Sequence, residues 1–550
     1  MSPRGTGKMG SLARRGAVTS VVAAAVCVWG ASTLAACTAY SDDCGEKLAC
    51  VLDAEPPPDP CAGEPGTAPA LDQCGVFVSE RGDDENPGTK RAPVKTLQHA
   101  IGLAASGRGK SEAPTRRVYA CGGEFEEAVT LPSGVDLWGG RRCEAGEWSY
   151  GWSFDGPNHP TTIAPPVGTP LRVIAGAVDV TSTIAGVRVV AADASAVDGK
   201  SSIAMILSPG AKAKVVSSEI IAGDGKDGEP GDDAPQERAT DGEEGNDGAS
   251  ACTAEVASGA PPVVTVCDDG VESVGAYGGD GGSERGGDGA SGLPIAASNP
   301  GNEGLGGVGA DSARCESGED GAKGADGGRA AGAVGVGYLT VDGWIGVRGE
   351  DGRKGGIGQG GGGGGGSKSR GAMTACPTTR PDGGAAGGSG GSGGCGGDGG
   401  KGGGYGGASI GIIALQGAVL TVEDARVTAA NAGRGGVGGT GQPGGYGRAG
   451  GKGGQGFTGT AITWHACDGG GGGNGGRGGD AGGGLGGASF GIASVGASVA
   501  LAFDATVLPG QPGQGGLAGN AAPDDDEGMG AVGLARFWYR FDAPDPEPPQ

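Results

Sequence analysis

Cysteine is the residue type whose placement in this chain suggests chemistry most directly. Of the 14 cysteines, Cys27 lies in an apolar N-terminal run, and Cys37 follows Leu34-Ala35-Ala36 just after that run. The remaining cysteines form an even set of twelve, which favours disulfides in an oxidising compartment. They are Cys44, Cys50, Cys61, Cys74, Cys121, Cys143, Cys252, Cys267, Cys315, Cys376, Cys395 and Cys467. Their spacing does not match that of a zinc site.

The histidines and carboxylates give no readable catalytic arrangement. The histidines are His99, His159 and His465, too scattered for a Ser/His/Asp or Cys/His set. Gly393–Asp398 and Gly475–Asp480 match the first six positions of a calcium-binding nonapeptide, G-G-x-G-x-D, but glycine stands where that motif needs a large apolar residue. Asp398 and Asp480 are therefore weak Ca²⁺ candidates, and we expect no other metal, no cofactor and no catalytic residue.

The first 37 residues have the order of parts of an export signal. Arg14-Arg15 precede an apolar run from Ala17 to Ala31, which is too short to span a bilayer and fits a signal-peptide core. Leu34-Ala35-Ala36-Cys37 then resembles the lipobox of bacterial lipoproteins, in which the cysteine is alkylated by diacylglycerol and the chain is cut before it. The resemblance implies a membrane anchor at Cys37. Thr38 replaces that family's inner-membrane retention aspartate, which favours an outer membrane.

Glycine dominates the composition. It supplies 131 of 550 residues, whereas aromatic residues make up 4%. This excludes a conventional core and favours a repetitive, solenoid-like architecture. The formal net charge is −24, and residues 223–330 hold 23 acidic and six basic residues, a local balance of −17. We expect a solvated acidic surface or a cation-binding one there; because it would repel phosphates, nucleic-acid binding is not expected.

Residues 74–155 carry the most conventional pattern. In GTKRAPVKTLQHAIGLAA (88–105), Thr96 is placed to cap a short helix with Leu97, Ile101 and Ala104 on one face. Strand-like VYACGGEF and AVTLPSGVDLWGG follow. These motifs resemble the opening of right-handed parallel β-helix proteins of the pectate-lyase-like superfold. The resemblance implies an all-β fold, a right-handed parallel β-helix (solenoid) interrupted by glycine-rich inserts.

That resemblance also implies a disulfide. Cys121 and Cys143 are 22 residues apart, about one coil in that family. Neighbouring rungs lie about 4.8 Å apart, within the Cα separation that a disulfide tolerates. We expect Cys121 to pair with Cys143, and further pairs between Cys252 and Cys267 and between Cys395 and Cys467.

One unit recurs further along the chain. Residues 202–220, 409–427 and 489–507 each run from a serine to an Ile or Val, alternate apolar residues, and share a turn at Gly210, Gly417 or Gly496. We expect the units to stack as successive coils. Stacking would place apolar rows in contact: Ile410, Ile412 and Val422 against Phe490, Ile492 and Leu501. A weaker copy is at 334–349, and 530–541 resembles an opening half.

Glycine-rich inserts separate these units. Each leaves after the second strand of a unit and returns before the next serine, so all should emerge from one corner of the β-helix. From Gly435 to Gly459, nine glycines fall at strict intervals of three, and every third residue of a threefold extended helix lies on one edge. Packed polyglycine-II-like helices, collagen-like trimers and flexible linkers all fit this pattern, although collagen would need more proline.

The whole layout resembles the glycine-rich PGRS proteins of myxobacteria. The lipobox, CGVFVSERGDDENPGTK with PVKTLQHAI, VYACGGEF, and GGASIGI and GGASFGI beside GGx arrays carry the resemblance. It implies a cell-envelope lipoprotein, lipid-anchored at the outer membrane and surface-exposed, with a structural or adhesive role, no catalysis, and cell-surface polymers or other envelope proteins as partners. The alternative is a carbohydrate-active or carbohydrate-binding β-helix protein, because that superfold also hosts polysaccharide lyases and hydrolases.

These patterns divide the chain into twelve parts. They are 1–36, lipoprotein signal peptide; 37–73, lipid-anchored Pro/Cys-rich tether; 74–222, β-helix N-terminal cap and first coils; 223–330, acidic Gly-rich insert; 331–349, β coil; 350–407, Gly-rich insert; 408–430, β coil; 431–487, Gly-rich insert; 488–509, β coil; 510–529, Gly-rich insert; 530–541, terminal strand; and 542–550, disordered tail.

Overall fold

The structure, a computed structural model, covers the chain from residue 59 onward with short gaps. It describes residues 59–106, 116–154, 159–195, 200–295, 299–370, 376–457 and 464–542. Residues 60–550 form one compact unit. The expected signal peptide, Cys37, most of the tether and residues 543–550 lie outside the described residues. The described fold is nearly all β, with a single α-helix, α1 (Leu97–Ser106), and a short 3-10 helix, η3 (Glu144–Gly146).

Three sheets of parallel strands form the body of this unit, which we call the strand stack. Sheet A contains β1 (Val76–Val78), β2 (Arg117–Cys121), β5 (Asp136–Arg142), β9 (Ser182–Ala185), β12 (Lys212–Val216), β19 (Val419–Glu423) and β22 (Ser498–Leu501), with β6 (Ser149–Tyr150) antiparallel to β5. Sheet B contains β3 (Gly123–Phe125), β7 (Thr161–Ile163), β10 (Val187–Val190), β13 (Glu219–Ile221), β20 (Arg426–Thr428) and β23 (Thr506–Leu508). Sheet C contains β4 (Val129–Pro132), β8 (Leu171–Ile174), β11 (Ser202–Leu207), β18 (Ser409–Ala414), β21 (Ser489–Val495) and β24 (Ala535–Phe541).

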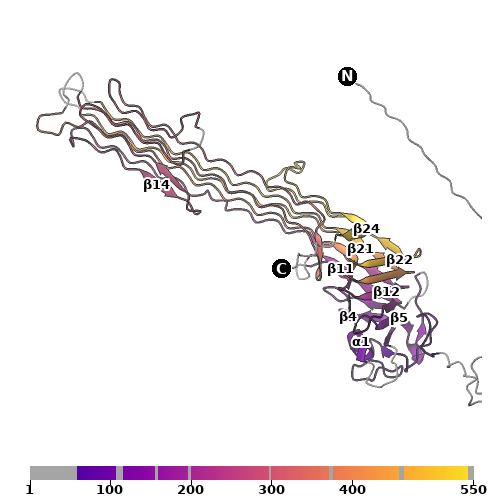
Figure 1. The fold of residues 1–550 in the computed structure, drawn as a ribbon. Coiled ribbons are helices and arrows are strands. Elements are labelled where there is room, and N and C mark those ends of the chain that lie inside the picture. The colour runs from indigo at the N-terminus through magenta and orange to yellow at the C-terminus, as the bar shows by residue number, and fades with distance from the viewer. Residues whose placement is uncertain are drawn as a thin grey trace, which may run out of the picture. The chain divides into compact units, whose positions relative to one another are not determined.

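The chain visits these sheets in a fixed order. From β4 onward it passes through sheets C, A and B in turn, as β4–β5–β7, β8–β9–β10, β11–β12–β13, β18–β19–β20 and β21–β22–β23, and it ends in sheet C with β24. Strands in equivalent positions of successive passes pair in parallel (Figure 1). Each pass therefore adds one strand to every sheet.

The expected stacking of the three long units is confirmed, with its register. Ser202 pairs with Ser409 and Ser409 with Ser489. The apolar rows meet as predicted: Ile410 with Phe490, Ile412 with Ile492, and Val422 with Leu501. Ile412, Val422 and Ile492 belong to one continuous buried core that runs through the stack. The alternation of apolar residues thus sets which side of each strand is buried.

The structure corrects the expected two-strand unit. Each unit contains three strands, because its second half bends between sheets A and B. The bend falls at Ser217 in the first unit and at Asp424 in the second, where φ is +43° and +40°. The expected turn glycines Gly210 and Gly417 have a left-handed φ of +71°, which glycine adopts without strain. The inserts therefore leave after the third strand, in sheet B, and return to sheet C.

A second correction concerns residues 331–349, which do not add a coil to the stack. They contain β16 (Tyr338–Thr340) and β17 (Gly343–Ile345), an antiparallel hairpin closed by two residues. A tight turn reverses the chain, whereas a coil must lead it onward to the next sheet. Trp344 of this hairpin belongs to the same buried cluster as Ile203 and Ile410. A further hairpin, β14 (Val263–Val266) with β15 (Glu272–Gly275), lies within the first insert.

Helix α1 covers one end of the stack, as expected. Leu97, Ala100, Ile101 and Ala104 are buried against the first strands. The four amides at the helix start that lack an intrahelical acceptor are all satisfied: Asp84 accepts from Thr96, the Glu127 carboxylate accepts from Leu97 and Gln98, and the Thr96 hydroxyl accepts from His99. The N-terminal end of the helix is therefore fully capped.

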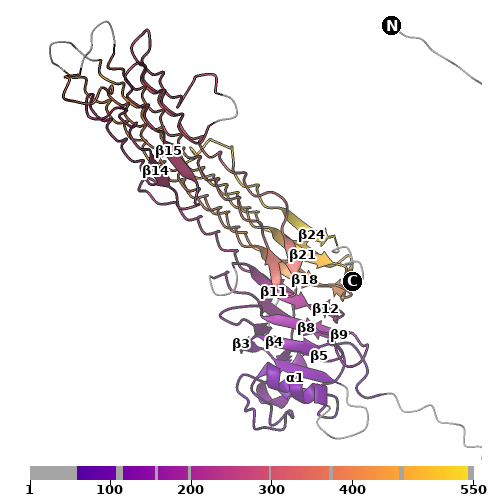
Figure 2. The same cartoon turned by 60° about the vertical axis from the view of Figure 1, so that its left-hand side comes forward.

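The described parts of the glycine-rich inserts are packed, unlike flexible linkers. They run side by side away from the strand stack as extended segments (Figures 1 and 2), and we call them together the glycine bundle. Outgoing residues 225–251 lie parallel to outgoing residues 431–455, with amides at three-residue intervals donating across: Gly225 to Asn431, Gly228 to Arg434 and Gly231 to Val437. The returning residues 386–407 run antiparallel to residues 225–251, with Gly407 donating to Lys226 and Gly404 to Glu229.

Hydrogen bonds leave a central segment in three directions. Amides of three consecutive residues donate to three different neighbours: Ala386 to Ala249, Gly387 to Gly279 and Gly388 to Cys467. The next three residues repeat the cycle: Ser389 to Asn246, Gly390 to Ala276 and Gly391 to Gly470. The amides on each of the three edges of this segment thus donate to a different neighbouring segment. In this way the buried backbone amides find acceptors although the segments do not form a β-sheet.

Glycine is required here by the spacing between segments. A Cβ added at Gly390 would lie 1.9 Å from the Gly361 carbonyl oxygen, and one at Gly391 would lie 2.1 Å from that of Arg448. A side chain at either position would have to push two hydrogen-bonded backbones apart.

Replacing one such glycine should therefore loosen the bundle. We expect Gly390→Ala to lower the free energy of unfolding by about 1–3 kcal/mol, the usual cost of overpacking. Gly328→Ala is the matched control, because a Cβ at Gly328 would meet no heavy atom within 4 Å. Urea unfolding followed by circular dichroism measures both. Equal stability of the two variants would contradict the close packing.

Candidate functional site

Aspartates of the first outgoing segment form a regular row of contacts with the neighbouring segment. Asp224, Asp227 and Asp233, and again Asp241 and Asp247, are separated by multiples of three residues, which places each group on one edge of a threefold segment. Each Oδ1 accepts a backbone N–H from residues 431–452, at 2.7–2.9 Å. The donors are, in order, Asn431, Arg434, Thr440, Tyr446 and Lys452. We call these five pairs the aspartate ladder.

The same contact recurs elsewhere in the bundle. The carboxylates that accept backbone amides include Asp320 from Gly471, Asp326 from Arg477, Asp351 from Gly402, Asp468 from Gly453 and Asp480 from Gly441. A hydrogen bond to an ionised acceptor is stronger than one between neutral groups. We call these hydrogen bonds from a backbone amide of one segment to an aspartate of another the aspartate joints. Part of the expected acidic surface is therefore used to hold segments together. The three-residue spacing of the aspartates is the feature of the sequence that could have indicated these hydrogen bonds.

At Asp233, Asp326 and Asp351, these hydrogen bonds lower the pKa of the carboxyl group. The backbone hydrogen bond from Thr440 is the largest cause of the lowered pKa of Asp233, and that from Gly402 is the largest cause for Asp351. For Asp326, the Lys323 side chain contributes most to the lowered pKa and the Arg477 amide next. These carboxylates consequently stay ionised to a lower pH in the folded chain than in the unfolded one.

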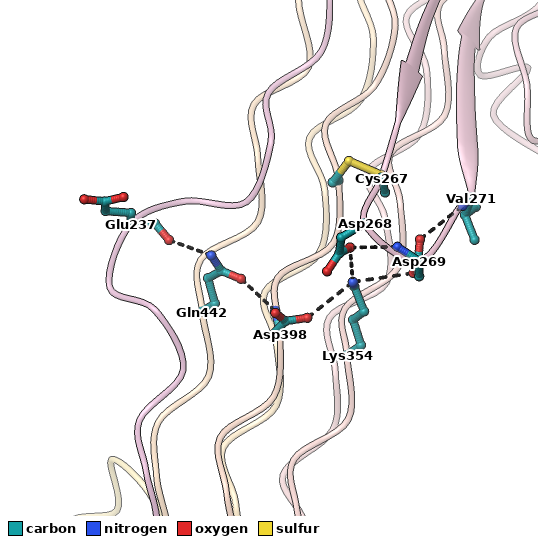
Figure 3. Close-up of polar contacts among 9 residues, drawn as sticks. Glu237, Cys267, Asp268, Asp269, Val271, Lys354, Asp398 and Gln442 are labelled. Carbon is teal, nitrogen blue, oxygen red and sulfur yellow. Dashed lines mark hydrogen bonds and ion pairs between the residues drawn. A yellow bond between two sulfur atoms is a disulfide. The ribbon is translucent and has the colours of Figure 1, made fainter.

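Lys354 joins several segments of the glycine bundle (Figure 3). Its Nζ lies 3.3 Å from Asp398 Oδ1 and 3.5 Å from Asp269 Oδ2, and it also contacts Asp268. Burial lowers the pKa of Lys354, but hydrogen bonds to Asp268 and Asp398 outweigh burial and leave the pKa raised. Lys354 is therefore a charged cross-link and is poorly suited to act as a base or nucleophile.

Both weak Ca²⁺ candidates are already paired with basic side chains. Asp398 faces Lys354, and Asp480 receives Arg477 through two hydrogen bonds of 2.6 and 2.9 Å. Within the described ranges, no group of three or more His, Cys, Asp or Glu is arranged to hold a metal ion. In each case a basic side chain already pairs with the carboxylate.

Five disulfides lie within the described residues. Cys121 pairs with Cys143, as one coil of separation predicts, and Cys61 pairs with Cys74. The expected pairs Cys252–Cys267 and Cys395–Cys467 are wrong. The bundle pairs are Cys252–Cys376, Cys267–Cys395 and Cys315–Cys467, separated by 124, 128 and 152 residues. Segments far apart in sequence lie side by side here, so proximity along the chain does not select partners.

Part of the expected tether, at residues 61–65, is instead fixed to the outside of sheet A. Arg117 and Arg141 are both buried there, and they donate to the carbonyls of Cys61 and Pro65 at 3.1 and 2.7 Å. The Arg117 guanidinium also lies 3.3 Å over the Trp138 ring. These contacts were not anticipated from the sequence, where the two arginines directly flank the strand-like stretches.

Comparison with known proteins gives no relative. No family model and no curated protein matches the chain. In the part of the chain that the structure describes, no helix has the length and apolarity needed to cross a bilayer. Cys37, the expected lipidation site, lies outside the described residues.

The aspartate joints make stability depend on pH. The folded-state pKa values of Asp233, Asp326 and Asp351 lie below the unfolded value of about 3.9, so the folded chain binds fewer protons at these joints and their stabilisation is complete above about pH 4. It is lost as the pH falls through the folded-state values. We expect a steady melting temperature from pH 8 to 5 and a steep fall below pH 4, measured by circular dichroism.

The double variant Asp233→Asn/Asp351→Asn separates this effect from general acid unfolding. Asparagine keeps the Oδ1 acceptor but cannot be protonated, so the acid-induced loss should be smaller. Asp342→Asn, at the tip of the β16–β17 hairpin, is the control and should keep the full loss. The same acid profile for the double variant and the unmodified chain would contradict the assignment.

Proposed function

We propose that the chain is an exported cell-envelope lipoprotein, acylated at Cys37, that presents the glycine bundle at the cell surface in a structural or adhesive role. The observation that carries the proposal is the three-way hydrogen bonding of the bundle. It makes a rigid body from backbone and small residues, which suits a protein whose task is to hold and present a surface.

We interpret the bundle as an array of polyglycine-II-like helices. Every third amide of a segment donates to the same neighbour, and three consecutive amides donate to three different neighbours. This pattern fits threefold helices packed side by side. A collagen-like trimer fits less well, because its chains bond only within a group of three. At a rise of about 3.1 Å per residue, residues 225–251 would reach about 80 Å.

We interpret the strand stack as a right-handed parallel β-helix of the pectate-lyase-like kind. The cyclic order of sheets C, A and B supports this interpretation. Crossovers between parallel strands are right-handed in nearly all proteins, which supports the handedness. The stack would then serve as a stalk that fixes where each helix of the bundle begins and ends.

The contacts near residue 61 suit a chain held from its N-terminal side. Arg117 and Arg141 hold the 61–65 backbone to two different strands, and Cys61–Cys74 closes the loop behind them. A pull transmitted from an anchor at Cys37 would therefore reach the sheets through several bonds. This suits a load-bearing attachment; an outer membrane as its site, and surface polymers or envelope proteins as partners, are part of the same proposal.

Expression in a Gram-negative host with radiolabelled palmitate tests the proposal. We expect label on the chain, recovery in the membrane fraction, and a mature N-terminal peptide whose mass fits an acylated Cys37. A protease added to intact cells should also cut the chain.

Cys37→Ser is the matched control and should give unlabelled protein released from the membrane. Recovery of the unmodified chain as a soluble, unlabelled protein would contradict anchoring. Membrane recovery with protection of the whole chain from protease would instead contradict surface display.

A further inference from the structure

A pocket of about 520 Å³ opens at the end of the strand stack near helix α1. Its walls come from the loops after β1, the turn between β2 and β3, and the end of β5 with η3. The Cys121–Cys143 disulfide lies in one wall and Trp148 in another. The size is that of a site for a small molecule or a headgroup.

Basic side chains gather in this pocket, in a chain of net charge −24. Lining residues include Arg81, Lys90, Arg91, Arg141, Arg142 and His159, against only two carboxylates, Glu80 and Glu144. A low-dielectric cleft lined by one sign of charge concentrates the field and attracts ions of the other sign.

The cations of the pocket differ from those of the glycine bundle in their partners. In the bundle, Lys323, Arg448 and Arg477 form ion pairs with Asp326, Asp241 and Asp480. In the pocket, Arg91 and Arg142 have no acidic partner among the described residues, although acids outnumber bases in the chain by 64 to 40. Unpaired cations facing one cavity in an acidic chain are suited to an external anion.

The walls of the pocket are held in place. Cys121–Cys143 ties β2 to the residues after β5, and Arg141 is buried with hydrogen bonds to Pro65 and Trp148. The Trp148 ring N–H donates to the Lys90 carbonyl. A site formed in advance loses less entropy when a ligand binds.

We propose that this pocket binds a phosphate group. Guanidinium groups match phosphate oxygens in charge and geometry, and the pocket offers more than one of them. The phosphate could belong to a soluble ester or to a lipid headgroup at a membrane surface. The proposal does not require lipid attachment at Cys37.

Isothermal titration calorimetry with glycerol 3-phosphate and inorganic phosphate tests the site, with glycerol as the uncharged control. A second arm uses sedimentation with vesicles of phosphatidylglycerol or of phosphatidylcholine. All proteins carry Cys37→Ser, so that an anchor cannot contribute. Arg91→Gln/Arg142→Gln removes two exposed cations of the pocket. Arg536→Gln/Arg540→Gln removes the same charge from the exposed side of β24, in the last rung of the stack.

We expect the unmodified pocket to bind glycerol 3-phosphate but not glycerol. The affinity for glycerol 3-phosphate should fall at least tenfold in the pocket variant and stay unchanged in the β24 variant. Added salt should also lower this affinity. Pocket-dependent binding to phosphatidylglycerol vesicles without binding of the soluble esters would identify a headgroup as the source. Equal loss in both variants, or no binding to any phosphate probe, would overturn the proposal.

Discussion

Close approach of bare backbones is the interaction on which the rest of this structure depends. Each buried amide must find an acceptor, and in the bundle the acceptors are carbonyls of neighbouring segments. The approach leaves no room for side chains: a Cβ at Gly363 would lie 1.7 Å from the Tyr277 carbonyl oxygen. The composition of the chain, with 131 glycines and few aromatic residues, follows from this spacing. Side chains remain on the edges that do not face another backbone, and there they make the aspartate joints and ion pairs.

The strand stack sets the register in which these segments meet. Ser202 and Ser409 pair in sheet C with an offset of 207 residues, and the aspartate ladder continues that offset from Asp224–Asn431 to Asp233–Thr440. Beyond that point the offset is 205, as in Asp241–Tyr446. The first segment therefore accommodates two extra residues between Asp233 and Asp241, where Gln442 donates to the Glu237 carbonyl. The regular strands thus align long segments that have no apolar core of their own.

The sequence predicted the parts of the fold that repeat with a fixed length. Equal units with a shared turn gave the register of β11, β18 and β21, and one coil of separation gave the Cys121–Cys143 pair. It did not predict the bends at Ser217 and Asp424, because no glycine marks them and a positive φ is uncommon for other residues. The bundle disulfides were missed because they depend on which segments become neighbours. The basic pocket was missed for the same reason: its residues come from separate loops.

Hydrogen–deuterium exchange measured by mass spectrometry tests the central claim most directly. Amides that donate to neighbouring segments exchange only when the bundle opens. If the bundle is packed as described, peptides from 384–407 and 469–487 should be protected as strongly as those from β18 and β21. Exchange of these glycine-rich peptides at the rate of an unfolded chain, while the strands stay protected, would contradict the account.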